Sequence, residues 1–181
     1  ASDAERARLP RLRHVEGWLE QLIGLGCNGL LLGPVFESST HGYDTLDHFR
    51  IDPRLGGLDD FDHLIAAARE RGVGVVLDGV FNHVGAEHPL YRAALASADA
   101  PENELFGIDG RTGRPRARDC EGHGSLVALD HSQPAVEHLV ADVMIHWLAR
   151  GVAGWRLDAA YAVPAEFWAR VLPRVRAQFP D

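Results

Sequence analysis

The 181-residue sequence is long enough for one domain with a hydrophobic core, and 46% of its residues are hydrophobic, which excludes a disordered chain. The formal net charge of −8 argues against binding to nucleic acid or anionic lipid, because both require a basic surface. No apolar run approaches the roughly 18–20 residues that cross a bilayer, and the polar start ASDAERARLP lacks a signal-peptide pattern. We therefore expect no nucleic-acid or membrane partner and a cytoplasmic location.

The first part of the chain alternates helix and strand patterns. Apolar residues recur at helical spacing over residues 14–25, which predicts one helix with Trp18 on its buried face. The run NGLLLGPVF (28–36) is typical of a strand buried on both faces. A second helix is predicted over 58–72, and the run VGVVLD (73–78) predicts a second buried strand that ends in an aspartate.

The second part begins with a segment of a different kind. Residues 82–131 contain many Gly, Pro, Asp and Arg residues with weak periodicity, which indicates a long insertion, and such segments are usually functional. A strong helix pattern follows over 134–151, and VAGWRLD (152–158) predicts a third strand. The last helix pattern, over 164–179, contains Pro173, which we expect to bend or break it.

Strands that alternate with helices predict an α/β fold with right-handed crossovers and a parallel sheet. Two arrangements satisfy this order: an open doubly wound sheet, or part of a (β/α)8 barrel. In both arrangements the chemistry lies at the C-terminal ends of the strands.

Charged and polar residues occur at these strand ends. Asp78 and Asp158 each end an apolar run, Asn82 and His83 follow closely after Asp78, and Arg156 precedes Asp158 by two positions. Alternation along a strand places Arg156 and Asp158 on the same face. A guanidinium beside two carboxylates favours their ionised form, so they are candidates for a nucleophile, a base or a metal ligand. The alternative is an ion pair that only joins the strands.

Other kinds of site lack their motifs. The sequence has no GxGxxG after a strand, no P-loop and no GxSxG, so a phosphate cradle or a serine nucleophile elbow is not indicated. The histidines lack the HExxH spacing of helical zinc sites. We therefore predict no metal and no cofactor.

Four stretches of the sequence resemble motifs of the α-amylase family of glycoside hydrolases. These are HGYDTLDHFRIDPRLGG (41–57), DGVFNHVG (78–85), LVALDHSQPAV (126–136) and GWRLDAAYAVP (154–164). Their order and spacing also resemble those of the family.

The resemblance implies a partial (β/α)8 TIM barrel of parallel strands, with a long insertion after the second strand of this chain. Residues 1–81 then hold helix 1 to strand 3, residues 82–131 are an insertion like the family's domain B, and residues 132–181 hold helix 3 to helix 4. Since this arrangement lacks the first barrel strand, we expect the chain to need self-association or the missing half of the barrel.

The resemblance also implies a retaining glycoside hydrolase that acts on α-1,4-linked glucans or maltooligosaccharides. Asp158 matches the nucleophile that forms a covalent glycosyl-enzyme, and Arg156 matches the arginine that orients it. Asp78 and Asn82 match residues that brace the site, and His83 matches one that hydrogen-bonds the sugar. A glucosyl transferase of the same family remains an alternative.

Three further residues have implied substrate-binding roles. Tyr43 matches the aromatic platform under the sugar, Asp44 a polar neighbour in the same loop, and Tyr161 a position that contacts the acceptor sugar. Calcium, which many family members bind, is possible but not favoured. Asn82 matches one of its ligands, but Ala162 stands where calcium-binding amylases usually have histidine.

Retaining enzymes need a second carboxyl group as acid/base. The family's acid/base glutamate follows its fifth strand, a position that the chain does not reach. Glu37, Glu121 and Glu166 are poor substitutes, because they lie in loops or on the last helix without motif support. We therefore expect the isolated chain to be inactive, and a non-catalytic sugar-binding or assembly fragment remains a second alternative.

Overall fold

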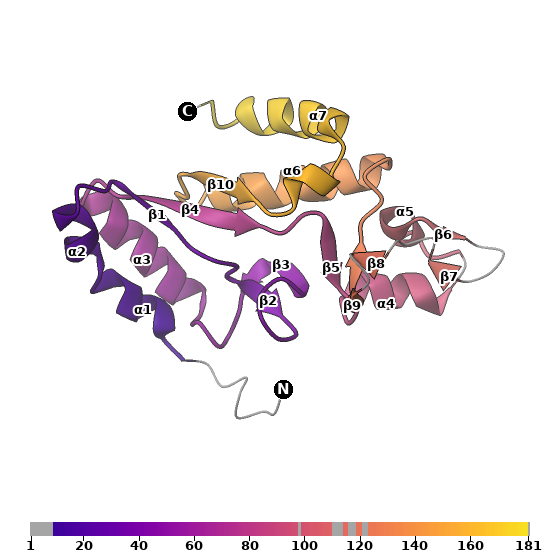
Figure 1. The fold of residues 1–181 in the computed structure, drawn as a ribbon, viewed down its shortest axis with the longest axis horizontal. Helices are drawn as coiled ribbons and strands as arrows, with labels where there is room; N and C mark the ends of the chain where they lie inside the picture. The colour runs from indigo at the N-terminus through magenta and orange to yellow at the C-terminus, as the bar shows by residue number, and fades with distance from the viewer. Residues whose placement is uncertain (1–8, 98, 110–113, 116–118, 121–122, 181) are drawn as a thin grey trace.

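The computed structural model describes residues 9–97, 99–109, 114–115, 119–120 and 123–180. At its centre lies a parallel sheet with the strand order β1-β4-β10. Its strands are β1 (Gly29–Leu31), β4 (Gly74–Gly79) and β10 (Gly154–Leu157). The sheet runs along the long axis of the molecule, and the C-terminal end of β4 points toward the inserted segment (Figure 1). The predicted α/β class and the parallel pairing are confirmed.

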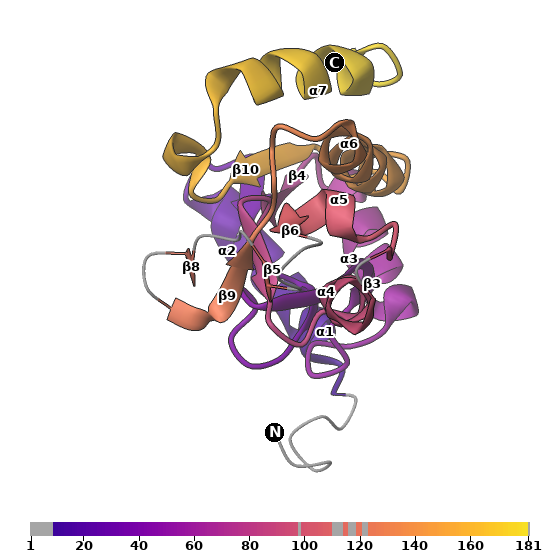
Figure 2. The same cartoon turned by 90° about the vertical axis from the view of Figure 1, so that its right-hand side faces the viewer.

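Helices pack beside this sheet. They are α1 (Arg11–Glu16), α2 (Leu19–Gly24), α3 (Leu58–Glu70), α6 (Pro134–Leu148), η1 (Ala160–Ala162) and α7 (Ala165–Arg176). Of these, α3 lies in the connection that leads into β4, and α6 in the one that leads into β10. Figure 2 shows α3 and α6 on the same side of the sheet and α7 beyond β10. The start of α3 is closed by Asp60, whose Oδ2 accepts a hydrogen bond from the Gly57 amide at 2.9 Å, as expected for an acidic first turn.

A hairpin and the insertion complete the fold. The hairpin, β2 (Phe36–Ser38) with β3 (Thr45–Ile51), follows β1. The insertion has its own elements: β5 (His83–Gly85), α4 (Pro89–Ala96), α5 (Asn103–Phe106), β6 (Ile108–Asp109), β7 (Arg114–Pro115), β8 (Asp119–Cys120) and β9 (His123–Ala128). The order β5-β9-β8 forms a small antiparallel sheet. The predicted division at residues 82–131 stays a prediction, although these local elements are consistent with it.

Aromatic residues form the core between the hairpin, α3 and α6. Trp147 is fully buried, with its ring centroid 5.2 Å from that of Phe36 and 5.0 Å from that of Phe61. Its indole N–H donates to the carbonyl oxygen of His48 at 2.8 Å. Burial of such aromatic side chains supplies much of the hydrophobic stabilisation, and the hydrogen bond satisfies the buried N–H. The core therefore fixes the hairpin against α6.

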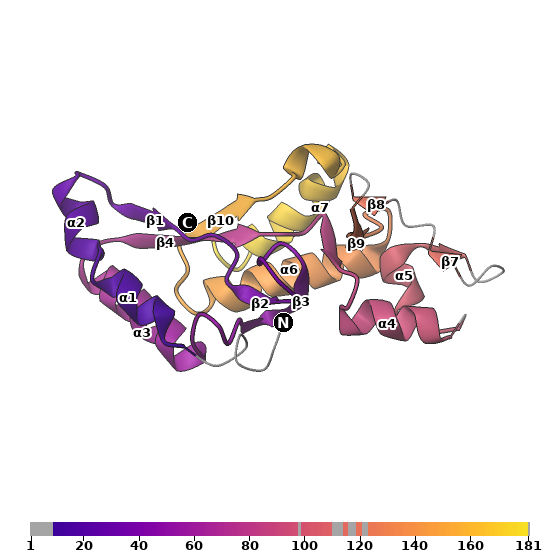
Figure 3. The ribbon, with the colours of Figure 1, turned by 60° about the horizontal axis from the view of Figure 1, so that its bottom comes forward.

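Two predictions about elements were wrong, and a third was wrong in part. The helix predicted over 14–25 is two short helices, α1 beside α3 and then α2 (Figure 3), with a break at Gly17 that leaves Trp18 71% exposed. The strand β1 is not buried on both faces, because it is the outer strand of the described sheet and Leu31 is 54% exposed. The helix α7 continues through Pro173, so the predicted break does not occur, while the predicted bend stays a prediction.

Candidate active site

Three charged side chains meet at the C-terminal ends of β4 and β10. Nη1 of Arg156 donates to both carboxylate oxygens of Asp78, at 2.7 and 2.8 Å, and to Oδ1 of Asp158 at 2.8 Å. Hydrogen bonds to Asp78, and then the nearby charge of Asp158, raise the pKa of Arg156 above its ordinary value. One guanidinium group therefore joins two carboxylates.

The pairing of the strands produces this cluster. Arg156 lies directly opposite Asp78 in the register of β4 and β10, and the amide of Asp158 donates to the carbonyl oxygen of Gly79 at 3.0 Å. The side chain of Asp78 is 5% exposed, whereas that of Asp158 is 16% exposed. The more accessible carboxylate is thus the one that resembles the family's nucleophile.

The backbone turns sharply immediately after Asp158. Ala159 has φ 46° and ψ 32°, the left-handed region, and it is the non-glycine residue with positive φ among the described residues. Such a conformation costs an alanine about 1–2 kcal/mol, and strained residues of this kind cluster at functional sites. The turn directs the chain from β10 into η1 and fixes the backbone on which the Asp158 carboxylate is carried.

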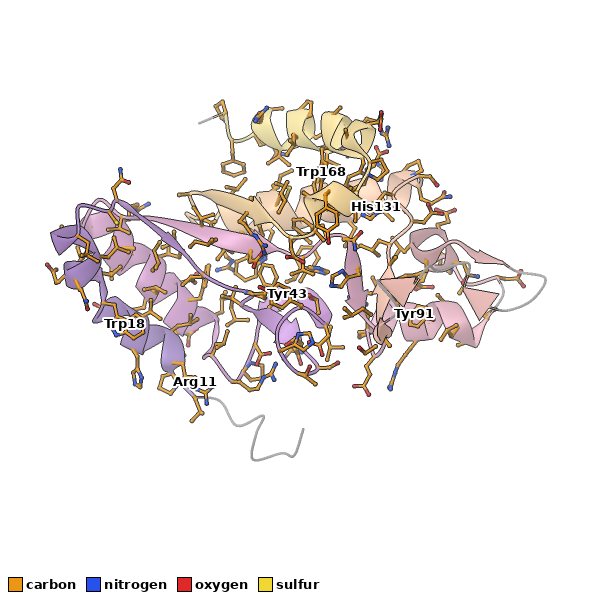
Figure 4. The ribbon with its side chains drawn as sticks, viewed as in Figure 1. Arg11, Trp18, Tyr43, Tyr91, His131 and Trp168 are labelled. Carbon is orange, nitrogen blue, oxygen red and sulfur yellow. The ribbon has the colours of Figure 1, made fainter. Side chains whose placement is uncertain are left out.

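Tyr43 and His83 lie on the other side of Asp78. The hydroxyl of Tyr43 donates to Oδ2 of Asp78 at 3.4 Å, and Tyr43 itself belongs to the loop between β2 and β3 (Figure 4). Nε2 of His83 lies 3.0 Å from the carbonyl oxygen of Tyr43, and Nδ1 lies 3.3 Å from Nδ2 of Asn82. His83 and Asn82 are buried, so their contacts order the start of the insertion.

Asp44 stabilises the loop that carries Tyr43. Its carboxylate accepts hydrogen bonds from the Thr40 hydroxyl at 2.6 Å and from the His41 amide at 3.2 Å. Burial raises the pKa of Asp44, but the hydrogen bonds from Thr40 and the nearby His41 lower it by more than burial raises it. The net pKa of Asp44 therefore lies below its ordinary value. Asp44 is 4% exposed, which makes it a support of the loop.

Two buried histidines hold the backbone that follows Asp78. Nε2 of His48 lies 3.1 Å from the carbonyl oxygen of Val80, and Nε2 of His131 lies 2.9 Å from that of Phe81. Because a carbonyl oxygen only accepts, each nitrogen carries the proton that it donates. Burial lowers the pKa of both histidines, which keeps the rings neutral. The backbone between Asp78 and the insertion is therefore held by hydrogen bonds from two sides, from His48 in β3 and from His131 after β9.

The β10 end of the site is exposed. The side chain of Arg156 is 45% exposed, and β10 is the outer strand of the described sheet. Tyr161 follows in η1 and is 83% exposed, so this end of the site is open to solvent.

The charged and histidine side chains of the described residues are not gathered in a way that forms a metal-binding group. No group of three or more His, Cys, Asp or Glu side chains in this part of the chain is arranged to hold a metal ion. The side-chain nitrogen of Asn82 faces His83, and Ala162 contributes no side-chain ligand. The expectation about calcium stays a prediction.

Comparison with known proteins identifies the family. A family model described as "Alpha amylase, catalytic domain" matches residues 9–121, more than half of the chain. The chain belongs to the α-amylase family. Among curated members, an intracellular maltogenic amylase of Bacillus subtilis is 33% identical over 170 residues, which are 90% of this chain and 28% of that protein. Neopullulanase 2 of Thermoactinomyces vulgaris is 32% identical over 177 residues, 94% of this chain and 30% of that protein.

Solved structures of the family have a similar fold. The ligand-free cyclic α-maltosyl-(1→6)-maltose hydrolase of Arthrobacter globiformis has a TM-score of 0.86 and 35% identity, covering 94% of this chain and 40% of that one. The Eubacterium rectale protein Amy13B has a TM-score of 0.82 and 28% identity, with coverages of 94% and 38%. The chain is thus part of a TIM barrel of this family and spans about 28–40% of the length of these relatives.

Sequence reasoning placed the strand-end residues but missed several that support them. His48, His131 and Ala159 had no assigned role, and neither did Asp52 and Arg54, which form an ion pair after β3. The letters IDPR (51–54) lie inside the stretch 41–57 that resembles a family motif. An arginine two positions after an aspartate in a loop was the available sequence signal for this ion pair. The acid/base candidates gain no support: Glu37 pairs with Arg50 at 3.1 Å, Glu166 lies in the first turn of α7, and Glu121 lies outside the described residues.

Within the described residues, no helix is both long and apolar enough to cross a membrane.

Proposed function

We propose that the protein is a retaining glycoside hydrolase that acts on α-1,4-linked glucans or maltooligosaccharides, with Asp158 as the nucleophile. The observation that carries the proposal is the hydrogen bond from Arg156 to Asp158, together with the bidentate contact of the same nitrogen with Asp78. A carboxylate held beside a cation at a strand end is oriented and charged for attack.

In the proposed reaction, the free oxygen of Asp158 attacks the anomeric carbon and the glycosidic bond breaks, leaving a glycosyl ester on Asp158. Water then attacks the same carbon and releases the carboxylate. Asp78 is buried against Arg156, so it braces the cation and does not serve as the proton donor. The acid/base that protonates the leaving oxygen and activates the water lies, in this proposal, outside the described residues.

The substrate side of the proposal rests on Tyr43, His83 and the named relatives. We assign the ring of Tyr43 as the platform for the reacting sugar, His83 as a hydrogen-bonding neighbour, and Tyr161 as an exposed acceptor-side contact. Asn82 and Asp44 support the residues that we assign to contact the sugar. The Arthrobacter globiformis neighbour is described as a hydrolase of cyclic α-maltosyl-(1→6)-maltose, and another structure of it holds maltose. We also propose a cytoplasmic location, after the Bacillus subtilis relative named intracellular.

The test uses the protein in its natural length with maltotriose as substrate. Replacing Asp158 by Asn should lower kcat by about 10³-fold or more, because the covalent step has no other route. The control is Asp142→Asn, an exposed acid on α6 that should leave kcat unchanged. A slow fluorosugar substrate should leave a glycosyl adduct on the peptide that contains Asp158, detected by mass spectrometry. Full activity of Asp158→Asn would refute the assignment.

A further inference from the structure

The loop between β2 and β3 determines where Tyr43 lies. Residues 39–44 connect the two strands, and within them Gly42 has φ 98°, where an added Cβ would lie 2.9 Å from Cβ of Pro34. The amide of Ser39 donates to the carbonyl oxygen of Asp44 at 3.1 Å, which closes the loop. Tyr43 reaches Asp78 from this loop, so any group that holds the loop also holds the tyrosine.

A charged pair beyond the end of β3 holds the first part of the loop. Nη2 of Arg54 donates to the hydroxyl of Ser38 at 2.6 Å and to its carbonyl oxygen at 3.2 Å, and Nη1 donates to the carbonyl oxygen of Thr40. Asp52 accepts from the amide and the hydroxyl of Ser38, both at 3.2 Å. Two side chains thus satisfy several polar groups of residues that lie 14 to 16 positions away.

The pair itself is ordered and largely buried. Asp52 accepts from the amide of Arg54 at 2.9 Å and from its Nε at 2.8 Å, with a further contact from Nη2. The side chains of Arg54 and Asp52 are 20% and 5% exposed. Burying charges is favourable only when they are paired and their remaining hydrogen-bonding groups are satisfied, and in this pair the loop carbonyls provide that satisfaction. The pair and the loop therefore stabilise each other.

The contacts continue from this pair to the site. Thr40, whose carbonyl accepts from Arg54, donates its hydroxyl to Asp44 at 2.6 Å. Asp44 adjoins Tyr43, which contacts Asp78 through its hydroxyl and His83 through its carbonyl oxygen. A planar guanidinium can serve an aspartate and two separate carbonyls at once, whereas a lysine ammonium has a different geometry and fewer donors.

We propose that Arg54, held by Asp52, is a positioning residue for the Tyr43 platform: it fixes the loop of residues 39–44 and so the distance of the aromatic ring from Asp78. The proposal rests on the proposed function for the role of Tyr43, but the ordering of the loop is independent of it. The guanidinium of Arg54 donates to Asp52, Ser38 and Thr40, all on the hairpin side, so it acts on the site through Tyr43.

The first test is a double-mutant cycle in the natural-length protein with maltotriose. Arg54→Lys keeps the charge but loses the fork geometry, and it should lower kcat/KM about tenfold, because a displacement near 1 Å costs up to about 10²-fold. In a Tyr43→Ala background the same change should cost less than about twofold. The matched control is Arg50→Lys on the same hairpin, an exposed arginine paired with Glu37, which should have no coupling to Tyr43. Equal losses with and without Tyr43 would overturn the proposal.

The second test does not depend on catalysis. Hydrogen exchange of the peptide that covers residues 39–44 should be at least about tenfold faster in Arg54→Lys than in the unchanged protein and unaltered in Arg50→Lys. Unchanged exchange in Arg54→Lys overturns the positioning role. If Arg54→Lys does not fold, Ser38→Ala removes one Arg54 contact at 2.6 Å and should still speed exchange. An unchanged protein without activity on any α-glucan would refute the proposed function, while the exchange result would still decide the role of Arg54.

Discussion

The two sides of the candidate site are held in different ways. On the hairpin side, His83 contacts the carbonyl oxygen of Tyr43 and Asp44 accepts from Thr40, and Asp44 and His83 are at most 4% exposed. On the β10 side, Arg156 is 45% exposed and Tyr161 83% exposed, and the order comes from ion pairs and one strained residue. The comparison indicates that the hairpin side is preorganised by burial, whereas the β10 side is set by backbone geometry and charge.

The largest expected effect on stability comes from acid and tests the burial of His88, the ring of which packs against that of His48 in β3 of the hairpin. Burial and neighbouring His48 lower the pKa of His88 from 6.5 to about 4. The unfolded chain therefore binds a proton in this interval that the folded chain does not, so stability is complete above about pH 6.5 and falls as the pH drops to about 4. We expect a loss of about 3 kcal/mol from this residue, measured by urea unfolding at pH 7, 5 and 4.

The matched variant for this prediction is His88→Asn. His88 is the N-cap of α4 and accepts from the Leu90 amide at 3.2 Å, and asparagine is also a good N-cap. The variant should therefore keep the helix and show a shallower pH dependence. The remainder is due to the other groups whose pKa is lowered in the folded protein, which are His48, His131, His146, Asp44, Asp52 and Asp130. An identical pH profile would show that His88 does not titrate in this way.

A smaller effect tests the close contact between the insertion and the hairpin. A Cβ at Gly85 would lie 2.7 Å from the carbonyl oxygen of Asp44 and 3.0 Å from its carbonyl carbon, which are backbone atoms that cannot rotate away. We expect Gly85→Ala to destabilise the protein by about 1–3 kcal/mol in thermal or urea unfolding. The control is Gly154→Ala on β10, where an added Cβ has no neighbour within 4 Å. Equal stability of the two variants would contradict the comparison.

The smallest effect concerns the strained residue on the β10 side. Ala159→Gly removes the strain of an alanine in the left-handed region, but a glycine costs about 0.5–1 kcal/mol more conformational entropy on folding. The two effects oppose each other, so the free energy of unfolding of the variant should change by less than about 1 kcal/mol. Ala162→Gly, in the same turn without positive φ, should lose about 0.5–1 kcal/mol. Denaturant melts of both variants check this, and a larger loss in Ala159→Gly would mean that the strain is absent.

The strand-end cluster was predictable from the sequence, because it depends on the local pattern of each strand. Alternation in a strand places Arg156 and Asp158 on one face, and parallel strands bring Asp78 to the same edge. The exposure of Arg156 was not predictable, because a strand pattern does not reveal what covers the strand. The break at Gly17 was also missed, since apolar spacing of 3.6 continues across it.

The network of Asp52 and Arg54 was not predictable from spacing. Its partners lie 14 to 16 positions earlier and include main-chain carbonyls, which carry no residue identity in a sequence. Loop hydrogen bonds of this kind depend on where the hairpin turns, and the pairing of β2 with β3 contains irregular register shifts. The family motif marked the region, but only the structure separated Tyr43 from the residues that hold it.

The position of Arg156 opposite Asp78 also bears on how the sheet assembles. The two residues are 78 positions apart, with the whole insertion between them. A slip of β10 by one residue would turn the guanidinium to the other face and leave Asp78 buried without a cation. Misaligned pairing therefore has an electrostatic cost that correct pairing avoids. The charges that we assign to catalysis thus also discriminate against misfolded strand alignments while the chain folds.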